Sequence, residues 1–231
     1  KKLKVDELHR VRFLLEEEEV ALRNAMDERE RELVEQRERY NDWLRARQIA
    51  PFPSLRSRAY ADYLKPMVLL AMNTGLRRGE LFSLQSRDVD LARGILTVRA
   101  ESAKNARSRH VGINKEAREV LECWGIPDFG ATLIFPNPRT NQRFDNITKS
   151  WNGLVKKADL EDFRFHDLRH HFASKLAMSG VDLLTIKELL GHASLDMTLR
   201  YAHLAPDHKL RAVDVLDSEA RMRKQTRTTT N

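Results

Sequence analysis

The sequence is poor in cysteine and has no long apolar run. Cys123 is its one cysteine in 231 residues, so neither a disulfide framework nor a cysteine metal cluster can form. No stretch approaches the ~20 apolar residues that a membrane-spanning helix requires, and residues 1–13 lack the apolar centre of a signal peptide. These absences predict a protein of the reducing cytoplasm that is neither exported nor inserted in a membrane.

Helix breakers are missing from long parts of the chain. Residues 15–47 contain no Gly or Pro and are rich in Glu, Arg and Leu, which predicts one or two charged helices with Leu22, Ala25 and Met26 facing inward. Two prolines in IAPFPSLRSR then predict a connecting loop. Further helices are expected over 60–75, 77–84, 114–124, 145–157, 167–178, 182–190 and 195–203. We expect Gly75, Gly180 and Gly191 to end three of these helices, and Asp182 and Ser194 to be N-caps.

Alternating β-branched residues occur in one part of the chain only. ILTVRA and RHVGI predict two strands within residues 95–113, paired as a hairpin whose tip is ESAKNARS. The predicted fold class is therefore α+β and mainly α-helical, a helical domain with one small antiparallel β-sheet.

The charge is unevenly distributed. Lys and Arg number 41 against 34 Asp and Glu, a net charge of +7, and the acidic residues crowd the segment 14–33. Basic residues instead recur in short loops and helix starts, namely SLRSRAY, LRRGE, AKNARSRH, NPRTNQR, FRFHDLRHH and the tail RMRKQTRTTTN. Such a surface suits a phosphate backbone, although an ordinary solvated surface carries similar charges.

Three basic groups point to a bound phosphate more specifically. His166, Arg169 and His170 share one side of a helix start, where the helix dipole is already positive, and Ala173 and Ala177 on the same side leave room for a ligand. An ordinary charged surface helix is the alternative.

The other two groups lie earlier in the chain. In NTGLRRGELFSL, Glu80 is placed to orient Arg77, whose planar guanidinium fits two phosphate oxygens. Lys104 at the hairpin tip can donate a proton to a leaving oxygen if Arg107 and Arg109 lower its pKa. A helix-start ion pair and a solvated lysine are the respective alternatives.

Tyr201 completes a set of residues that can react with a phosphodiester. Such a reaction needs a nucleophile, fixed cations for the charge that develops on the phosphate, and an acid for the leaving oxygen. The residues appear in order as Arg77 in TGLRRGEL, Lys104 in AKNARSRHVGI, His166 and Arg169 in HDLRHHFAS, His192 in LLGHASLDMT and Tyr201 in LRYAHL. With these motifs the chain resembles the tyrosine recombinases, most closely the phage-type integrases, over residues 14–205.

The resemblance implies a mechanism without cofactor or metal. Arg77, Arg169 and His192 would bind the scissile phosphate, and Tyr201 would attack it to form a 3'-phosphotyrosyl link. Lys104 would protonate the leaving 5' oxygen, and His166 would accept the phenolic proton. Glu80 would support Arg77 without taking part in the chemistry. A 5'-hydroxyl of a second duplex could then displace the tyrosine, which exchanges the strands.

The resemblance also implies an organisation and partners. We expect a linker remnant at 1–13, the tyrosine recombinase catalytic domain at 14–205, and a C-terminal segment with a basic tail at 206–231. This segment either docks on a neighbouring protomer or forms a local tail helix. Residues 1–13 are too short for the family's amino-terminal DNA clamp, so we expect an isolated catalytic domain. The expected partners are double-stranded DNA at an attachment site of a mobile element, further copies in a tetramer and DNA-bending accessory proteins, all in the cytoplasm at the nucleoid.

Two other classes of function compete with this interpretation. A DNA-binding module of the same fold would keep the cationic groove without chemistry. A metal-dependent hydrolase would use imidazole ligands, for which the candidates are His166, His170, His171, His192 and His203, although no HExxH motif is present.

Overall fold

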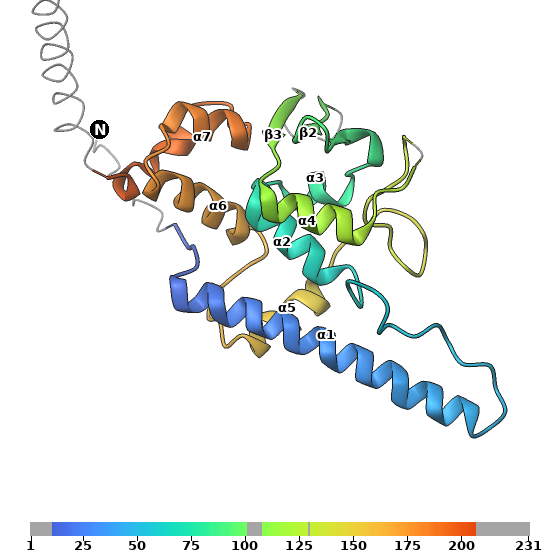
Figure 1. Ribbon diagram of the computed structural model, residues 1–231. Helices are drawn as coiled ribbons and strands as arrows, with labels where there is room; N and C mark the ends of the chain where they lie inside the picture. Colours follow the sequence, from blue (N-terminus) through green and yellow to red (C-terminus); the bar gives the residue numbers. More distant parts are fainter. Residues whose placement is uncertain (1–10, 101–107, 129, 207–231) are drawn as a thin grey trace, which may run out of the picture.

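The protein folds around one apolar helix. The computed structural model describes residues 11–100, 108–128 and 130–206. Helix α2 (Leu64–Thr74) is buried except at Lys65 and Asn73. Helix α4 (Lys115–Trp124) and helix α6 (Asp167–Met178) pack against it (Figure 1). The expected helix over 60–75 is therefore confirmed as part of the core, and it begins at residue 64.

The other elements surround this centre, with the small sheet at one edge (Figure 1). In chain order they are α1 (Glu16–Arg45), α3 (Arg78–Phe82), η1 (Ser86–Asp88), β1 (Val89–Asp90), β2 (Ile95–Val98), β3 (Arg109–Gly112), α5 (Thr148–Lys157), α7 (Leu183–Leu190), α8 (Asp196–Leu199) and η3 (Ala202–Leu204). No helix in the described part of the chain is both long and apolar enough to cross a membrane.

The sheet has the antiparallel strand order β1-β2-β3. Leu96 pairs with Val111 in the predicted hairpin, and both side chains are buried. Arg109 stands two residues before Val111, so its side chain lies on the same inward face of β3. Strand β1 was not predicted, because two residues are too few to show an alternating pattern. The sheet thus directs an arginine towards the interior, where α7 contacts β3.

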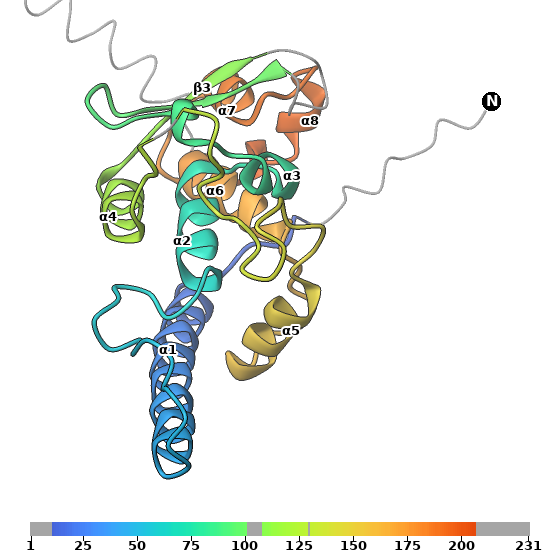
Figure 2. The same ribbon diagram turned by 90° about the vertical axis from the view of Figure 1, so that its right-hand side faces the viewer.

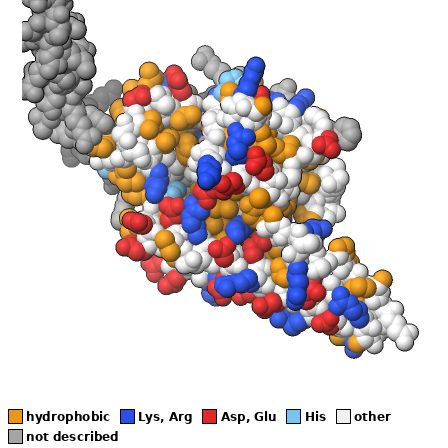
Figure 3. All heavy atoms as spheres, viewed as in Figure 1, with side chains coloured by type: hydrophobic (Ala, Val, Ile, Leu, Met, Phe, Trp, Pro, Cys, Tyr) orange, Lys and Arg blue, Asp and Glu red, His pale blue; other side chains and the backbone are white. Residues whose placement is uncertain are grey.

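Helix α1 is one helix of 30 residues, and its C-terminal part projects from the body (Figures 1 and 2). Leu22, Ala25 and Met26 are buried, which confirms the predicted inward stripe. Acidic and basic side chains are interspersed over the face of the projecting part (Figure 3). The helix is therefore anchored by its first half.

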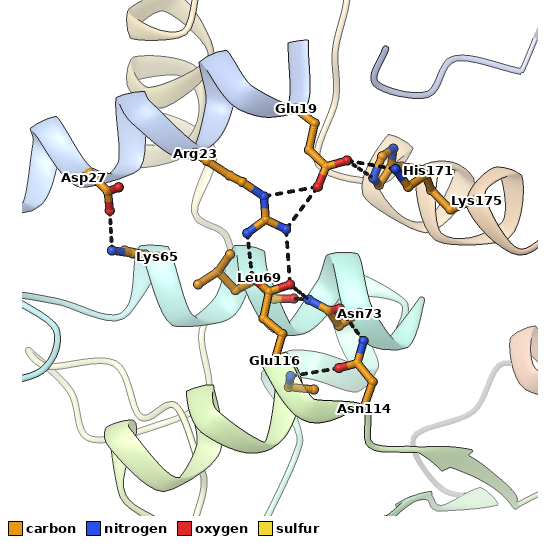
Figure 4. A network of polar contacts seen from close by, with 11 residues as sticks. Glu19, Arg23, Asp27, Lys65, Leu69, Asn73, Asn114, Glu116, His171 and Lys175 are labelled. Atoms are coloured by element: carbon orange, nitrogen blue, oxygen red, sulfur yellow. Dashed lines mark hydrogen bonds and ion pairs between the residues drawn. The ribbon is translucent and has the colours of Figure 1, made fainter. Parts of the chain in front are cut away.

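A polar network fastens this first half to the rest of the core (Figure 4). Arg23 binds Glu19 on its own helix and both carboxylate oxygens of Glu116 on α4. Glu19 in turn lies 3.5 Å from His171 and 3.3 Å from Lys175, both on α6. Helix α6, which carries the predicted basic group, is thereby held from the side opposite to that group.

Most predicted helix ends agree with the structure, and one does not. Gly75 and Gly191 have left-handed backbones at the ends of α2 and α7, and the Asp182 carboxylate accepts a hydrogen bond from the backbone N–H of Thr185 as an N-cap does. Ser194, however, is not an N-cap, because α8 starts at Asp196 with Leu195 in the capping position and has only four residues. Tyr201 consequently lies just beyond α8 and not on a helix over 195–203.

We expect Gly75→Ala to destabilise the protein by about 2 to 4 kcal/mol. The left-handed backbone (φ 61°) costs an L-residue about 1–2 kcal/mol, and a Cβ would lie 2.4 Å from Cδ1 of Phe172, which adds overpacking. Urea unfolding measures the change. Gly153→Ala is the matched control: apart from its chain neighbours and the backbone of its own helix α5, no atom lies within 4 Å of its Cβ position, so it should be neutral or stabilising. Equal stability of the two variants would contradict this packing.

Candidate active site

Arg169 is the buried centre of the candidate site. It is 4% exposed, and its guanidinium donates hydrogen bonds to the carbonyl oxygens of Gly75 and Leu190, at the ends of α2 and α7. Burial, followed by the positive charges of Arg77 and Arg109, lowers the pKa of Arg169 to about 9. The group still carries its charge at neutral pH, held between the ends of two helices.

Glu80 holds two further arginines beside it. One carboxylate oxygen accepts from Nη1 of Arg77 at 2.9 Å, and Arg109 donates to both oxygens at 2.9 and 2.7 Å. Arg77 also donates to the carbonyl of Gly191. The predicted contact between Glu80 and Arg77 is thus present, and Arg109 joins it from the sheet.

Arg109 contributes to the site in a way that the sequence interpretation missed. The sequence interpretation used Arg109 only as a positive neighbour of Lys104. In the structure its side chain enters the core, where Nε donates a hydrogen bond to the carbonyl oxygen of Leu189. It passes so close to Gly191 that a Cβ there would lie 2.8 Å from its Cδ. The sequence could have indicated this position, because the alternation in RHVGI places Arg109 on the same face of the strand as the apolar Val111. Lys104 and Arg107 lie outside the described residues.

His192 lies near these cations and is neutral. Its Nδ1 is 2.8 Å from Oγ1 of Thr198, which is fully buried. Burial, followed by Arg169, Arg77 and Arg200, lowers the pKa of His192 to about 3. His166, at the N-cap position of α6, is exposed.

Tyr201 is almost completely buried. It is 1% exposed and packs in a small cluster with Ala173, Ala177, Ile186 and Leu190. Burial raises the pKa of its hydroxyl to about 12, although Arg169 and Arg200 act in the opposite direction. The space beside the two alanines, expected to receive a ligand, therefore belongs to the cluster that includes the tyrosine ring.

The hydroxyl of Tyr201 contacts a histidine. Its Oη lies 2.6 Å from Nδ1 of His170. The sequence interpretation gave the phenolic proton to His166, whose ring centroid lies 5.2 Å from that of His170. His170 was detectable only as a member of the basic side of α6, because α8 and the chain after it determine where the phenol lies.

The arrangement provides fixed positive charge for an anion. Arg77 and Arg109 share the carboxylate of Glu80, close to the charge of Arg169, and Arg200 adds a fourth charge next to Tyr201. A phosphate oxygen is the ligand that such guanidinium groups favour. A metal centre fits less well, since His170, His192 and His171 face Tyr201, Thr198 and Glu19 respectively. Among residues 11–100, 108–128 and 130–206, no three His, Cys, Asp or Glu side chains converge as metal ligands would.

We expect Glu80→Ala to destabilise the fold by about 3 kcal/mol, since it leaves two partly buried guanidinium groups without their carboxylate. Burial alone would raise the pKa of Glu80, but Arg109, followed by Arg77, lowers it below its ordinary value. The ionised Glu80 carboxylate therefore makes its full contribution to the free energy of unfolding above its ordinary pKa of 4.5. This contribution is lost as the pH falls through the lower pKa of the folded state.

Urea unfolding of the unaltered chain and Glu80→Ala, at several pH values from 7 downwards, measures this difference. The gap between the two should narrow below pH 4.5. Glu80→Gln is the control, because it keeps one acceptor oxygen and should lose less. A gap independent of pH would show that the charge of Glu80 does not stabilise the fold.

Known proteins resemble this chain in sequence and in fold. The family model described as the phage integrase family matches residues 17–208. The integrase of Salmonella phage P22 is 33% identical over 166 residues, which cover 67% of this chain and 43% of that protein. The chain thus spans less than half the length of this relative.

Two solved structures have the same fold. The catalytic domain of bacteriophage HP1 integrase has a TM-score of 0.58 and 26% identity, and the alignment covers 89% of this chain and 95% of that one. A crystal structure of XerA recombinase has a TM-score of 0.60 and 28% identity, with coverages of 90% and 66%. The fold is that of tyrosine recombinase catalytic domains. The chain belongs to the phage integrase family.

Proposed function

We propose that this chain is the catalytic part of a site-specific DNA recombinase, an integrase that cleaves and rejoins DNA through a 3'-phosphotyrosyl intermediate. One observation carries the proposal: four separate segments bring Arg77, Arg169, His192 and the hydroxyl-bearing Tyr201 to one site. This combination offers a nucleophile and several cations without a metal, as attack on a phosphodiester requires.

The two arginines are suited to bind the non-bridging oxygens of the scissile phosphate. Each guanidinium has five N–H donors, and the bonds to Gly75, Leu190, Glu80 and Gly191 occupy only some of them. Those bonds fix the orientation of the remaining donors. Binding of DNA then needs little reorganisation of the site.

His192 supplies a third donor. A neutral imidazole has one N–H, and if Nδ1 accepts the hydroxyl hydrogen of Thr198, the proton is on Nε2. The Nε2–H can donate to the same phosphate oxygens. Thr198 thus selects the tautomer, a role that the sequence interpretation did not include.

Tyr201 attacks the phosphorus in this proposal, and His166 accepts its proton, as the family resemblance implies. Lys104 protonates the 5' oxygen that leaves, as the family resemblance implies. The phosphotyrosyl bond conserves the energy of the broken phosphodiester, so a 5'-hydroxyl can reverse the step or exchange the strands. Glu80 supports Arg77 without contacting the reacting atoms.

The proposed organisation follows the family. Residues 14–205 form the catalytic domain in this proposal. The segment 206–231, of which 207–231 lie outside the described residues, docks on a neighbouring protomer of a tetramer on DNA. The DNA is an attachment site of a mobile element, brought into shape by accessory bending proteins at the nucleoid. The cationic site supports DNA as the partner, and the match to integrases supports the mobile element.

A covalent adduct tests the proposal. The chain is incubated, with EDTA present, with nicked suicide duplexes from the attachment region that flanks the gene or from a genomic pool. A nick near the crossover lets the 5'-hydroxyl fragment diffuse away, so the protein stays linked to DNA. We expect an adduct on a denaturing gel, and digestion should map the link to the peptide that contains Tyr201.

The same experiment separates the competing functions. A non-catalytic DNA-binding module would retard the duplexes in a native gel without forming an adduct. A metal-dependent hydrolase would cut only without EDTA and would leave no protein on the DNA. Either outcome would contradict the proposed chemistry.

A further inference from the structure

Three consecutive backbone carbonyl groups at the C-terminal end of α7 each accept a hydrogen bond from an arginine. In chain order the pairs are Leu189 with Arg109, Leu190 with Arg169, and Gly191 with Arg77. The last carbonyl groups of a helix have no partner within it, and the helix dipole is negative at this end. The end of α7 therefore attracts three guanidinium groups even when no DNA is bound.

The three arginines belong to three different elements. Arg109 extends from β3, Arg169 from α6, and Arg77 from the N-cap position of α3. A shared partner is needed to keep side chains from separate elements in one fixed arrangement. The end of α7 is such a partner, and His192 follows it directly in the chain. The position of this helix end thus determines where the cations and the imidazole lie relative to one another.

Arg109 differs from the other two arginines because all three of its side-chain nitrogen atoms donate to the protein. Nε binds the carbonyl oxygen of Leu189, and Nη1 and Nη2 bind the two carboxylate oxygens of Glu80. Within the described residues, the side chains of Arg77 and Arg169 donate through Nη1 and Nη2 alone. Arg109 is therefore suited to hold other groups in place, whereas Arg77 and Arg169 keep Nε–H donors for a ligand.

The aliphatic part of Arg109 is also fixed. It crosses Gly191, where a Cβ would lie 2.8 Å from Cδ of Arg109. Gly191 has a left-handed backbone (φ 63°), so the helix end and the passing side chain both favour glycine at this position. Arg109 thus packs against the residue that precedes His192 and whose carbonyl oxygen binds Arg77.

We propose that Arg109 is a positioning residue for strand cleavage, which joins Glu80 to the end of α7. It thereby fixes Arg77, which binds both of these partners, and His192, which follows the helix, at the scissile phosphate. This rests on the proposed recombinase function. Donors that are already in place need no rearrangement as the charge of the transition state develops. The loss of Arg109 should therefore slow cleavage far more than it weakens DNA binding.

Cleavage rates of Arg109 variants test this role. At saturating suicide duplex, we expect Arg109→Met to reduce the single-turnover rate constant by about 10²-fold, the effect of a small misplacement of reacting groups. Its Kd for the duplex should rise by less than about threefold, because contacts to many backbone phosphates dominate binding. Arg109→Lys keeps the charge, but one ammonium nitrogen cannot replace the planar fork that binds Glu80 and Leu189 together. It should be equally slow, and it carries the test if Arg109→Met does not fold.

Arg29→Met is the matched control for the loss of an ion pair. Arg29 on α1 also donates to both oxygens of one carboxylate, that of Asp62, and its side chain is largely buried. Both methionine variants should therefore lose stability in urea unfolding. The fraction of folded protein changes the amplitude of a single-turnover reaction and not its rate constant. Arg29→Met should accordingly cleave with the rate constant of the unaltered chain.

Nitrogen NMR of the DNA-free chain detects the positioning without recombination. The ring of His192 reports the position of the end of α7, because its Nδ1 forms a hydrogen bond with the buried Thr198. We expect the ring nitrogen signals of His192 to shift in Arg109→Lys, although the charge at position 109 is kept. They should stay unchanged in Arg29→Met.

Three results would overturn the proposal. Cleavage by Arg109→Lys at the unaltered rate would show that only the charge matters. A loss of DNA affinity as large as the loss of rate would make Arg109 a DNA ligand. Unchanged His192 signals in Arg109→Lys would show that the end of α7 does not depend on Arg109. If the unaltered chain forms no adduct, the recombinase function itself fails, and the NMR comparison then decides separately whether Arg109 holds the end of α7.

Discussion

Tyr201→Phe is expected to form no covalent adduct with DNA that the unaltered chain attacks. The substitution removes one oxygen and keeps the ring in its cluster with Ile186 and Leu190. Every other group at the site remains, so the loss would assign the nucleophile. The measurement is the suicide-duplex reaction on a denaturing gel, with Tyr40→Phe as the matched control. Tyr40 is 48% exposed on the projecting part of α1 and should react normally.

Stability and DNA binding show whether the Phe variant is intact. The loss of the bond to His170 should cost about 1 kcal/mol, the usual net value of a hydrogen bond. Tyr201→Phe should retard the duplex in a native gel as much as the unaltered chain does, because the cations that bind phosphate remain. An adduct in the Phe variant would show that another residue attacks DNA.

The local elements were readable from the sequence because their signals are local. A charged run without helix breakers predicts α1, and an apolar helical run that ends at Gly75 predicts α2. Alternating β-branched residues predict the hairpin of β2 and β3. Helix α8 differs from the predicted helix over 195–203. Four residues fixed by contacts with α7 carry no period of their own, so Ser194 looked like the cap of a longer helix.

The partners within the site were harder to predict than its members. The family resemblance selected Arg77, Arg169, His192 and Tyr201 by motif. It could not show that Tyr201 is buried or that His170 receives its hydrogen bond, since both depend on how α6, α7 and α8 pack together. Arg109 was misjudged for the same reason: its partner, Glu80, is 29 residues away in the sequence.

Arg169→Met is expected to separate activity from stability. Cleavage should fall by at least about 10³-fold, because the phosphate loses a preorganised cation. Stability should change by less than about 2 kcal/mol, since two opposing effects accompany the change. The hydrogen bonds to Gly75 and Leu190 are lost, but a buried charge that Arg77 and Arg109 disfavour disappears as well. Methionine is flexible enough to fill the space.

Inorganic phosphate provides a measurement that needs no DNA. An anion that binds only the folded state raises its stability with concentration, so phosphate should raise the melting temperature of the unaltered chain more than that of Arg169→Met. Arg118→Met is the matched control, because Arg118 lies on α4 beside Glu122 and takes no part in the site. It should respond to phosphate like the unaltered chain and thus correct for general salt effects.

The two results together define what Arg169 does. A large loss of stability in Arg169→Met would mean that its bonds to the ends of α2 and α7 outweigh the cost of its charge, and that the residue is chiefly structural. An undiminished response to phosphate would place the anion elsewhere on the basic surface. The third outcome is a stable Arg169→Met variant that has lost both DNA cleavage and the response to phosphate. It would mean that the buried charge of Arg169 is unfavourable in the free protein and becomes favourable when the DNA phosphate binds.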